Sequence, residues 1–396
     1  MTPPYLAPSR IGSLSLRNRL VRAPTSETMA TEDGAATAGL IRLYGDLARG
    51  GAGLLLTGHI FVRPEGQCSP RQMALHHDRF IEGLSQLTAE VHAAGARIFA
   101  ELSHAGSQTM MPGLTPLAPS GVASAIYPGA PREITEAEIE EVVAAFGEAA
   151  RRAVAAGFDG IHIHGGNGYL AAQFASPLSN RRKDGWGGDS ERRGRFLLAV
   201  YDAIRKAVGP GVPITARYGV ADSAESGLTL EEGLARLETL VARGLDGVEP
   251  SLNLMRSYKE NIRPYVGVSA GRALRDWVVP RLWEPEGEQA YYLPLAHAIK
   301  ARVGIPVILV GGVRSTDRMA EILDSGAADF LSLARPLVRE PDLPNQIAAG
   351  RRGMVDCVSC NICLMHDGYD ALKCWRRDPR DLMRHALWRL RQATGS

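Results

Sequence analysis

Two stretches of this sequence place side chains that can do chemistry at close spacing. His164, Asn167 and Tyr169 follow the apolar run 160–164, in a glycine-rich turn. Neutral His and Asn side chains can donate to one substrate oxygen, and a Tyr phenol can supply a proton. The second stretch, 357–374, holds four cysteines spaced C-x2-C-x2-C-x10-C. Thiolates at such spacing can ligate a 4Fe–4S cluster or a zinc ion.

The elements that must position these groups alternate between short apolar runs and longer amphipathic ones. The pattern predicts strands at 19–24, 53–61, 97–102, 160–164, 213–218, 247–250, 306–312 and 329–334. It predicts helices at 77–94, 135–156, 189–208, 230–243, 289–302, 315–325 and 340–349, two of which begin at Thr135 and Thr229. About eight strand–helix units favour an α/β fold, a closed (β/α)8 TIM barrel, over an open doubly wound sheet. No dinucleotide-type glycine fingerprint follows the first strand, which agrees with the barrel.

The chain divides near residue 350. Residues 1–350 form the predicted barrel, and 351–396 form a short extension with the cysteine cluster and an amphipathic helix. We expect that helix to pack on the barrel through the face of Leu382, Ala386 and Leu390, although a partner protein is an alternative occupant. Three long segments after strand ends are expected to build the walls of an active site. They cover 103–134, 165–188 and 251–288, the last with Tyr258, Tyr265, Trp277 and Trp283.

Composition excludes several classes of function. The 396 residues carry a formal net charge of +2, which provides no general field for nucleic acid or an anionic membrane. No apolar run approaches the ~18 residues of a spanning helix. The first residues, MTPPYLAPSR, lack the pattern of a secretory signal. We therefore expect a cytoplasmic protein that acts on a small-molecule substrate, with neither nucleic acid nor membrane as a partner.

The stretch after the fourth predicted strand reads HIHGGNGYLAAQFASPLSNRRKDGWGGDSERRGRF, at 162–196. It resembles the old yellow enzyme family of FMN-dependent oxidoreductases, and the resemblance extends from about Leu14 to Arg335. The family fold is a (β/α)8 barrel, in agreement with the strand count. The resemblance implies FMN as cofactor and NAD(P)H as electron donor. It assigns Tyr169 as proton donor, with His164 and Asn167 holding a substrate carbonyl oxygen.

The resemblance also implies a set of flavin-binding positions at strand ends. They are Ala23, Pro24, Thr25, Gly58, Glu101, Arg217, Gly311, Gly312, Ala334 and Arg335. Thr25 would bond the flavin O4 edge and Gly58 would offer its backbone. The Arg217 guanidinium suits the negative charge of reduced flavin near N1 and O2. Gly311 and Gly312 allow close approach of amides to a phosphate, which Arg335 can grip with two nitrogens.

Glu101 departs from the family, which usually has Gln at this position. The Gln both donates to and accepts from the flavin pyrimidine edge, whereas an ionised Glu cannot donate. The sequence therefore predicts that Glu101 has either a salt bridge to a nearby Arg or a raised pKa.

Cys357, Cys360, Cys363 and Cys374 are the predicted metal ligands. Their segment resembles the cluster segment of the trimethylamine dehydrogenase and 2,4-dienoyl-CoA reductase branch of the family. A 4Fe–4S cluster is the favoured interpretation, with structural zinc and free thiols as alternatives. A cluster here would serve an electron-transfer protein or be largely structural. A basic stretch suits an acidic ferredoxin or flavoprotein; it comprises Arg376, Arg377, Arg380 and Arg384.

Three functional hypotheses follow. The first is an NAD(P)H-driven ene-reductase that reduces the C=C bond of an α,β-unsaturated carbonyl compound. The second is an oxidative amine dehydrogenase or N-demethylase that passes electrons through the cluster. The third is a flavoprotein subunit of a larger redox complex, which the His–Asn–Tyr set disfavours. The resemblance also implies a homo-oligomer.

Overall fold

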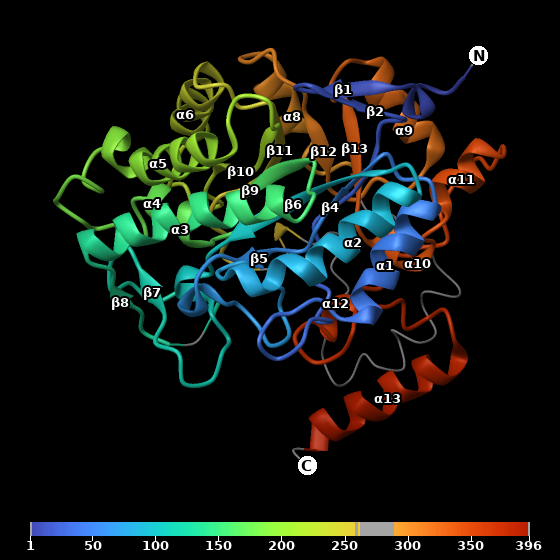
Figure 1. Cartoon of the computed structure of the whole chain (residues 1–396), viewed down its shortest axis with the longest axis horizontal. Helices are drawn as coiled ribbons and strands as arrows, with labels where there is room; N and C mark the ends of the chain where they lie inside the picture. The colour runs from blue at the N-terminus through green and yellow to red at the C-terminus, as the bar shows by residue number, and fades with distance from the viewer. Residues whose placement is uncertain (1, 125, 128, 258–259, 262–288, 395–396) are drawn as a thin grey trace.

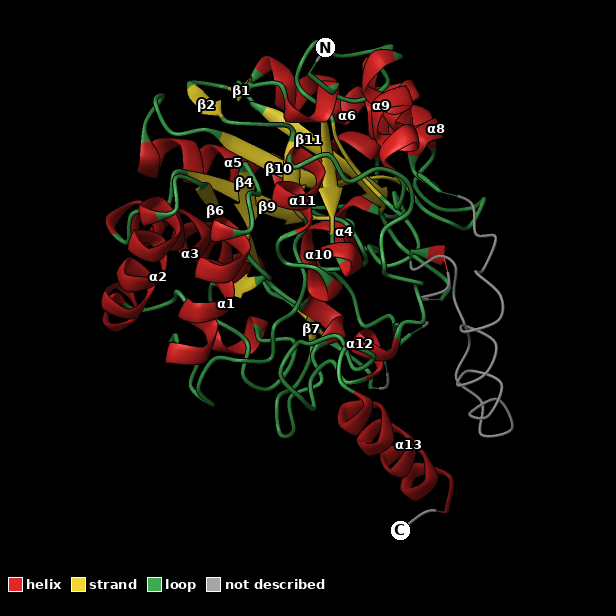
Figure 2. Ribbon diagram, turned by 90° about the vertical axis from the view of Figure 1, so that its right-hand side faces the viewer, coloured by secondary structure: helices red, strands yellow, loops and turns green. Residues whose placement is uncertain are grey.

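The computed structural model describes residues 2–124, 126–127, 129–257, 260–261 and 289–394. Eight parallel strands of these ranges form a barrel with helices on its outer side (Figures 1 and 2). In chain order the strands are β3 (Leu20–Arg22), β4 (Leu54–Leu56), β6 (Arg97–Ser103), β9 (Gly160–Gly165), β10 (Ile214–Ala221), β11 (Gly247–Leu252), β12 (Ile308–Val310) and β13 (Phe330–Leu333). A bridge between Val248 and Val307 links β11 to β12 and closes the circle. The predicted TIM barrel is therefore confirmed.

Helices connect successive strands and cover the outside of the barrel. They are α1 (Ala38–Arg49), α2 (Ile81–Ala93), α3 (Glu136–Ala155), α5 (Ser190–Val208), α6 (Leu230–Ala242), α8 (Leu293–Lys300), α9 (Thr316–Asp324), α10 (Arg335–Arg339) and α11 (Leu343–Ala348). Thr135 and Thr229 are the N-caps of α3 and α6, at the helix starts that the sequence predicts, and both form reciprocal capping boxes. Helix α1 is not among the predicted helices; it carries Gly39 and Gly45 inside its apolar pattern and is capped by Thr37. Within the described ranges, no helix has the length and apolar character that a membrane span requires.

A hairpin seals one end of the barrel and leaves the other end for the site. Strands β1 (Ser9–Ile11) and β2 (Leu14–Leu16) pair antiparallel before the first barrel strand. Ile11 and Leu16 pack against the side chains inside the barrel, such as Leu54, Phe99 and Phe330. Because this plug fills the amino-terminal end, the strands' carboxyl ends carry the polar groups described below.

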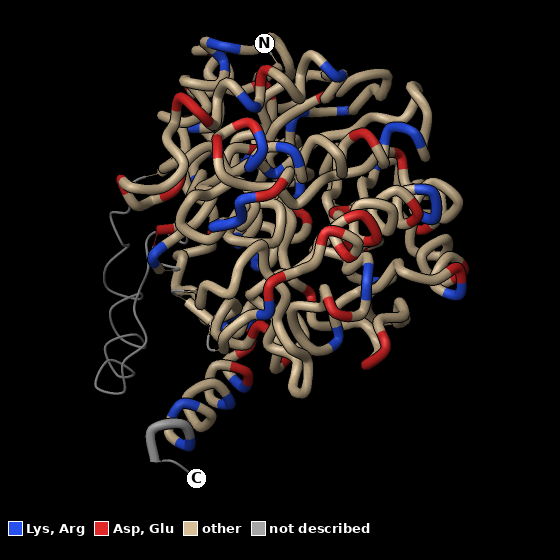
Figure 3. Tube along the Cα trace, turned by 90° about the vertical axis from the view of Figure 1, so that its left-hand side faces the viewer, with Lys and Arg blue, Asp and Glu red and all other residues tan. Residues whose placement is uncertain are grey.

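Most of the short elements lie near those carboxyl ends, whereas Pro4–Leu6 lies beside Arg19 at the amino-terminal end. The short elements are β5 (Ile60–Phe61), β7 (Leu117–Ala118), β8 (Arg132–Glu133), α4 (Leu170–Ala175) and the one-turn 3-10 helices Pro4–Leu6, Pro64–Gly66, Asp78–Phe80 and Gly106–Gln108. Figure 3 shows Lys and Arg interspersed with Asp and Glu over the barrel, as expected from the small net charge. Most of the predicted wall segment 251–288, with its four named aromatic residues, lies outside the described residues.

The extension after the barrel consists of α12 (Ile362–Met365) and α13 (Pro379–Thr394). Helix α13 reaches away from the barrel, in contrast to the expected packing (Figures 1 and 2). Its apolar residues Met383, Leu387 and Leu390 are exposed. Aromatic and polar contacts within the extension hold α13 instead: His366 stacks on Trp375 and lies against Trp388 of the helix, and Lys373 pairs with Asp381 at 2.6 Å.

Candidate active site

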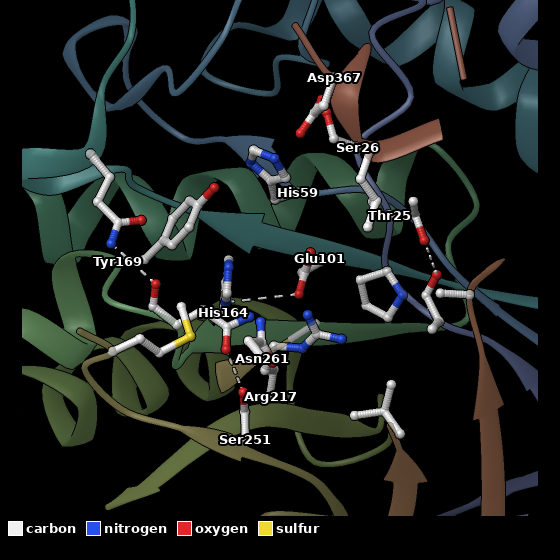
Figure 4. A pocket seen from close by; sticks show the side chains of 18 of the residues that line it. Thr25, Ser26, His59, Glu101, His164, Tyr169, Arg217, Ser251, Asn261 and Asp367 are labelled. Carbon is white, nitrogen blue, oxygen red and sulfur yellow. Dashed lines mark hydrogen bonds and ion pairs between the residues drawn. The ribbon is translucent and has the colours of Figure 1, made fainter. Parts of the chain in front are cut away.

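A cavity of about 450 Å³ opens at the carboxyl ends of the barrel strands (Figure 4). It brings together residues that lie more than 300 positions apart in the chain. From the sequence-predicted set it is lined by Ala23, Pro24, Thr25, Glu101, His164, Asn167, Tyr169, Arg217, Ala334 and Arg335. The C-terminal extension also contributes to its wall, through residues such as Asn361, Asp367 and Tyr369.

His164 and Tyr169 face the cavity together. His164 lies near the end of β9, and Tyr169 follows one turn later at the start of α4. Their ring centroids are 4.1 Å apart. Burial, reinforced by the positive charge of Arg217, lowers the pKa of His164 well below its ordinary value. The imidazole is therefore neutral at pH 7 and can act as a hydrogen-bond donor without carrying charge.

Asn167 presents its amide nitrogen to the cavity because other residues fix its orientation. Its backbone has a φ of 55°, a left-handed conformation that Asn tolerates. Gln108 Nε2 donates to the Asn167 carbonyl oxygen at 3.2 Å, and Ser251 Oγ donates to Asn167 Oδ1. Since Oδ1 is occupied, the Nδ2 donors remain for a ligand. Ser251 is not among the predicted site residues, because a Ser at the end of an apolar strand carries no distinctive pattern.

The Tyr169 hydroxyl has a sulfur partner that the sequence did not suggest. It donates to Cys68 Sγ at 3.3 Å, and Cys68 Sγ lies 3.4 Å from the Gln108 carbonyl oxygen, which it can donate to. Burial raises the pKa of the Cys68 thiol to about 12. Cys68 is therefore a neutral thiol that contacts the predicted proton donor.

Glu101 shows the second of the two predicted alternatives, a raised pKa. Burial raises its pKa to about 8, against the opposing charge of Arg217. Its Oε1 lies 3.9 Å from His164 Nδ1, and neither atom has a hydrogen-bond partner in the described chain. A protonated carboxyl can donate as well as accept, so Glu101 can replace the usual Gln at neutral pH.

Arg217 is held by a carboxylate that sequence analysis missed. Its Nε and Nη2 lie 2.7 and 2.6 Å from Glu249 Oε2, and Glu249 is fully buried. Ser332 Oγ also donates to Glu249, at 2.6 Å. The Arg217 charge and other hydrogen bonds outweigh burial and hold the pKa of Glu249 at about 2. An acidic residue inside the apolar run at 247–250 was the available signal for this partner.

Three of the predicted flavin positions lie outside the cavity lining. The Gly58 N–H donates to Glu27 Oε1 at 2.7 Å, so this backbone amide is already used inside the protein. Gly311 and Gly312 have φ values of 118° and 80°, but the Tyr291 ring packs over Gly311. The Gly58 amide and the face of Gly311 are thus engaged within the protein, and the role of the three glycines at the flavin stays a prediction.

The remaining residues fit a flavin. In the described chain, Glu101 Oε1 and His164 Nδ1 are buried polar atoms without partners, and both residues line the cavity, so the lining suits a ligand with both donors and acceptors. The flavin ring system is such a ligand. Arg217 and Arg335 also line the cavity, and a guanidinium such as that of Arg335 suits a phosphate.

Comparisons with known proteins agree with this geometry. The family model described as "NADH:flavin oxidoreductase / NADH oxidase family" matches residues 5–353. The chain belongs to this family. An NADH oxidase of Thermoanaerobacter brockii is 38% identical over 366 residues, which are 91% of this chain and 53% of that protein. A cinnamate reductase of Clostridium sporogenes is 32% identical, over 89% of this chain and 54% of that protein.

Solved structures of other proteins share the fold. A 2-naphthoyl-CoA reductase in complex with 2-naphthoyl-CoA superposes with a TM-score of 0.83 at 26% identity. The match covers 96% of this chain and 58% of that one. The chain thus spans about half the length of each relative named here.

The four predicted metal ligands of this family member lie together. Cys357, Cys360, Cys363 and Cys374 line one small cavity of about 90 Å³. Backbone N–H groups of Ser359 and Ile362 donate to the sulfurs of Cys357 and Cys360. In the described ranges, no three His, Cys, Asp or Glu side chains converge tightly enough for a single metal ion.

The two cavities share a wall. Arg335 and Asn361 line both, and Arg335 Nη1 donates to Asn361 Oδ1 at 2.5 Å. Asn361 stands between the second and third cysteines with a left-handed φ of 63°. The cysteine segment is thereby joined to the end of the flavin-sized cavity.

Proposed function

We propose that this protein is an FMN-dependent oxidoreductase that uses NAD(P)H to reduce an activated C=C bond. The observation that carries the proposal is the convergence of His164, Asn167 and Tyr169 on one cavity with flavin-compatible walls. The cinnamate reductase and the 2-naphthoyl-CoA reductase to which this chain is similar support an unsaturated acyl compound as the substrate that undergoes reduction. FMN, when bound, would take a hydride from NAD(P)H and pass it to the β-carbon.

The protein's own groups would hold the substrate and manage the proton. Neutral His164 and the Asn167 amide would donate to the carbonyl oxygen and stabilise the negative charge that develops there. Tyr169 would donate its phenolic proton to the α-carbon. Arg217 and protonated Glu101 would hold the flavin pyrimidine edge, Thr25 would lie beside it, and Arg335 would bind its phosphate.

The cysteine cavity supports a second element of the proposal. Cys357, Cys360, Cys363 and Cys374 would hold a 4Fe–4S cluster, which supplies one-electron chemistry and can serve an electron-transfer protein. A zinc ion is the alternative occupant, and binding it would require the described cysteines to move closer together. Two of the four basic residues expected to attract an acidic partner, Arg380 and Arg384, pair with Asp378 and Asp381. The surface around these arginines therefore carries less unpaired positive charge than the sequence alone indicates.

One observation favours oxidative amine chemistry as a second candidate. The exposed carboxylate of Asp367 lines the cavity, together with the aromatic ring of Tyr369. A carboxylate beside aromatic rings suits an ammonium group. Amines should therefore be assayed beside enones.

The test is anaerobic stopped-flow kinetics on the FMN-loaded protein. NADPH or NADH should bleach the flavin absorbance, and an α,β-unsaturated ketone should restore it. Tyr169→Phe should slow only the second phase. A different pattern would favour the second candidate instead. In that case amines would bleach the flavin absorbance, electron acceptors would restore it, and no enone would react. Iron and sulfide assays on protein purified without oxygen decide the occupant of the cysteine cavity; about four irons per chain support the cluster.

A further inference from the structure

His59 is a cavity residue for which the mechanism above has no task. It follows β4, and its ring faces the same space as those of His164 and Tyr169 (Figure 4). The centroid of its ring is 5.4 Å from that of Tyr169 and 6.2 Å from that of His164. His59 is thus close enough to contact the same substrate.

The orientation of a neighbouring amide, Gln72, is settled by two independent contacts. The backbone N–H of Cys68 donates to Gln72 Oε1 at 2.7 Å. On the other side, Gln72 Nε2 donates to the backbone carbonyl oxygen of His59 at 2.8 Å. A backbone N–H can only donate and a carbonyl oxygen can only accept, so both contacts assign Nε2 as the atom that faces His59.

This orientation determines where the His59 proton lies. Nδ1 of His59 is 2.7 Å from Gln72 Nε2 and must accept the hydrogen bond. Burial lowers the pKa of His59 to about 4, so the ring is neutral at pH 7. A neutral imidazole that accepts at Nδ1 carries its proton on Nε2. In the described part of the chain, that Nε2 makes no hydrogen bond.

The substrate group that suits this donor follows from the other donors. A carbonyl oxygen has two lone pairs, and His164 and Asn167 are placed to take both. The His59 donor is left for a second acceptor atom. Asp367 acts electrostatically on His59 and lines the same cavity. A carboxylate on the substrate at this position would therefore be repelled by the negative charge of Asp367. An uncharged carbonyl oxygen avoids this repulsion.

We propose that His59 selects unsaturated substrates that carry a second, uncharged carbonyl oxygen, which its Nε2–H binds. The inference rests on the proposed function, because it deepens the description of the same site. His59 is then a specificity-determining residue, and Gln72 is the positioning residue that holds its proton on the cavity side.

The kinetic test compares two ring substrates, cyclohex-2-enone and cyclohex-2-ene-1,4-dione, which differ by one carbonyl group. His59→Phe keeps a flat ring beside Tyr169 and removes the donor, whereas His59→Gln keeps a donor. We expect the ratio of kcat/KM for the dione over the enone to fall about tenfold in the Phe variant. In the Gln variant, this ratio should stay close to that of the wild type. An unchanged ratio in the Phe variant would overturn the proposal, since His59 would then act on the shared carbonyl or on neither.

Two further measurements do not depend on turnover. Absorbance titration of the FMN-loaded protein gives Kd for the saturated pair, cyclohexanone and cyclohexane-1,4-dione, and the dione preference should fall about tenfold in His59→Phe. Nitrogen-15 NMR at pH 7, assigned by loss of the signal in His59→Phe, should show a protonated Nε2. A His59 ring protonated on Nδ1 would refute the role of His59. An equal loss of affinity for both ketones in His59→Phe would refute it as well. Failure of the wild type to reduce either enone refutes the proposed function instead.

Discussion

Glu101→Gln is the substitution that tests the electrostatics of the site most directly. Glu101 is 1% exposed, and burial raises its pKa from 4.5 to about 8. Between these two pH values the unfolded chain has released this proton and the folded chain keeps it. The free energy of unfolding of the wild type therefore falls as the pH rises, and the Gln variant lacks this dependence.

The magnitude follows from the two pKa values. For each pH unit between them, the free energy of unfolding of the wild type falls by about 1.4 kcal/mol. Relative to the wild type, the free energy of unfolding of Glu101→Gln should rise by about 3 kcal/mol by pH 7 and by about 4 kcal/mol by pH 8. Above pH 8 it should rise little further. Any constant difference in packing between the two side chains adds an offset that does not vary with pH.

The assay is urea unfolding of flavin-free protein at pH 5, 6, 7, 8 and 9. Glu225→Gln, at an exposed site, controls for the change in net charge. A difference between Glu101→Gln and wild type that stays constant from pH 5 to 8 would refute the raised pKa. In FMN-loaded protein, the wild-type flavin potential should drop below that of Glu101→Gln above pH 8, because Glu101 ionises beside the flavin. Equal potentials throughout that range would show that Glu101 does not face the ring.

Three other substitutions test separate parts of the site. Tyr169→Phe should slow the enone-dependent reoxidation of the flavin by about 10²–10⁴-fold in stopped-flow traces, because it removes the general acid; an unchanged rate assigns the proton to another group. Ser251→Ala releases the Asn167 amide and should lower kcat/KM for enones about tenfold, with little change in flavin reduction by NADPH. Glu249→Gln leaves Arg217 buried without its charge partner and should cost about 3–5 kcal/mol in urea unfolding, while a loss under 1 kcal/mol would contradict this account.

The barrel could be predicted from the sequence because its information is local. Each predicted strand overlaps an observed one, since short apolar runs bounded by turns and amphipathic helices are legible within about twenty residues. The exceptions are equally local. Helix α1 contains Gly39 and Gly45, which weaken its pattern, and its packing against α2 and β4 helps to stabilise it.

The positions of the site residues were also foreseeable in part. His164, Asn167 and Tyr169 share one turn, so a motif could name them, and strand ends predicted that Arg217 and Arg335 would meet them in one cavity. The docking of α13 was not foreseeable. Its amphipathic pattern indicates a helix but names no partner, and the structure shows that the helix contacts the extension, where Trp388 lies against His366.

The sequence by itself determined the barrel, the family, and the residues with suitable chemistry, because these depend on pattern and spacing. Tertiary structure decided how those residues are tuned. The raised pKa of Glu101, the Glu249 partner of Arg217 and the use of the Gly58 amide by Glu27 each depend on contacts between distant segments. Burial and charge act through space, so only the folded chain shows which acid keeps its proton.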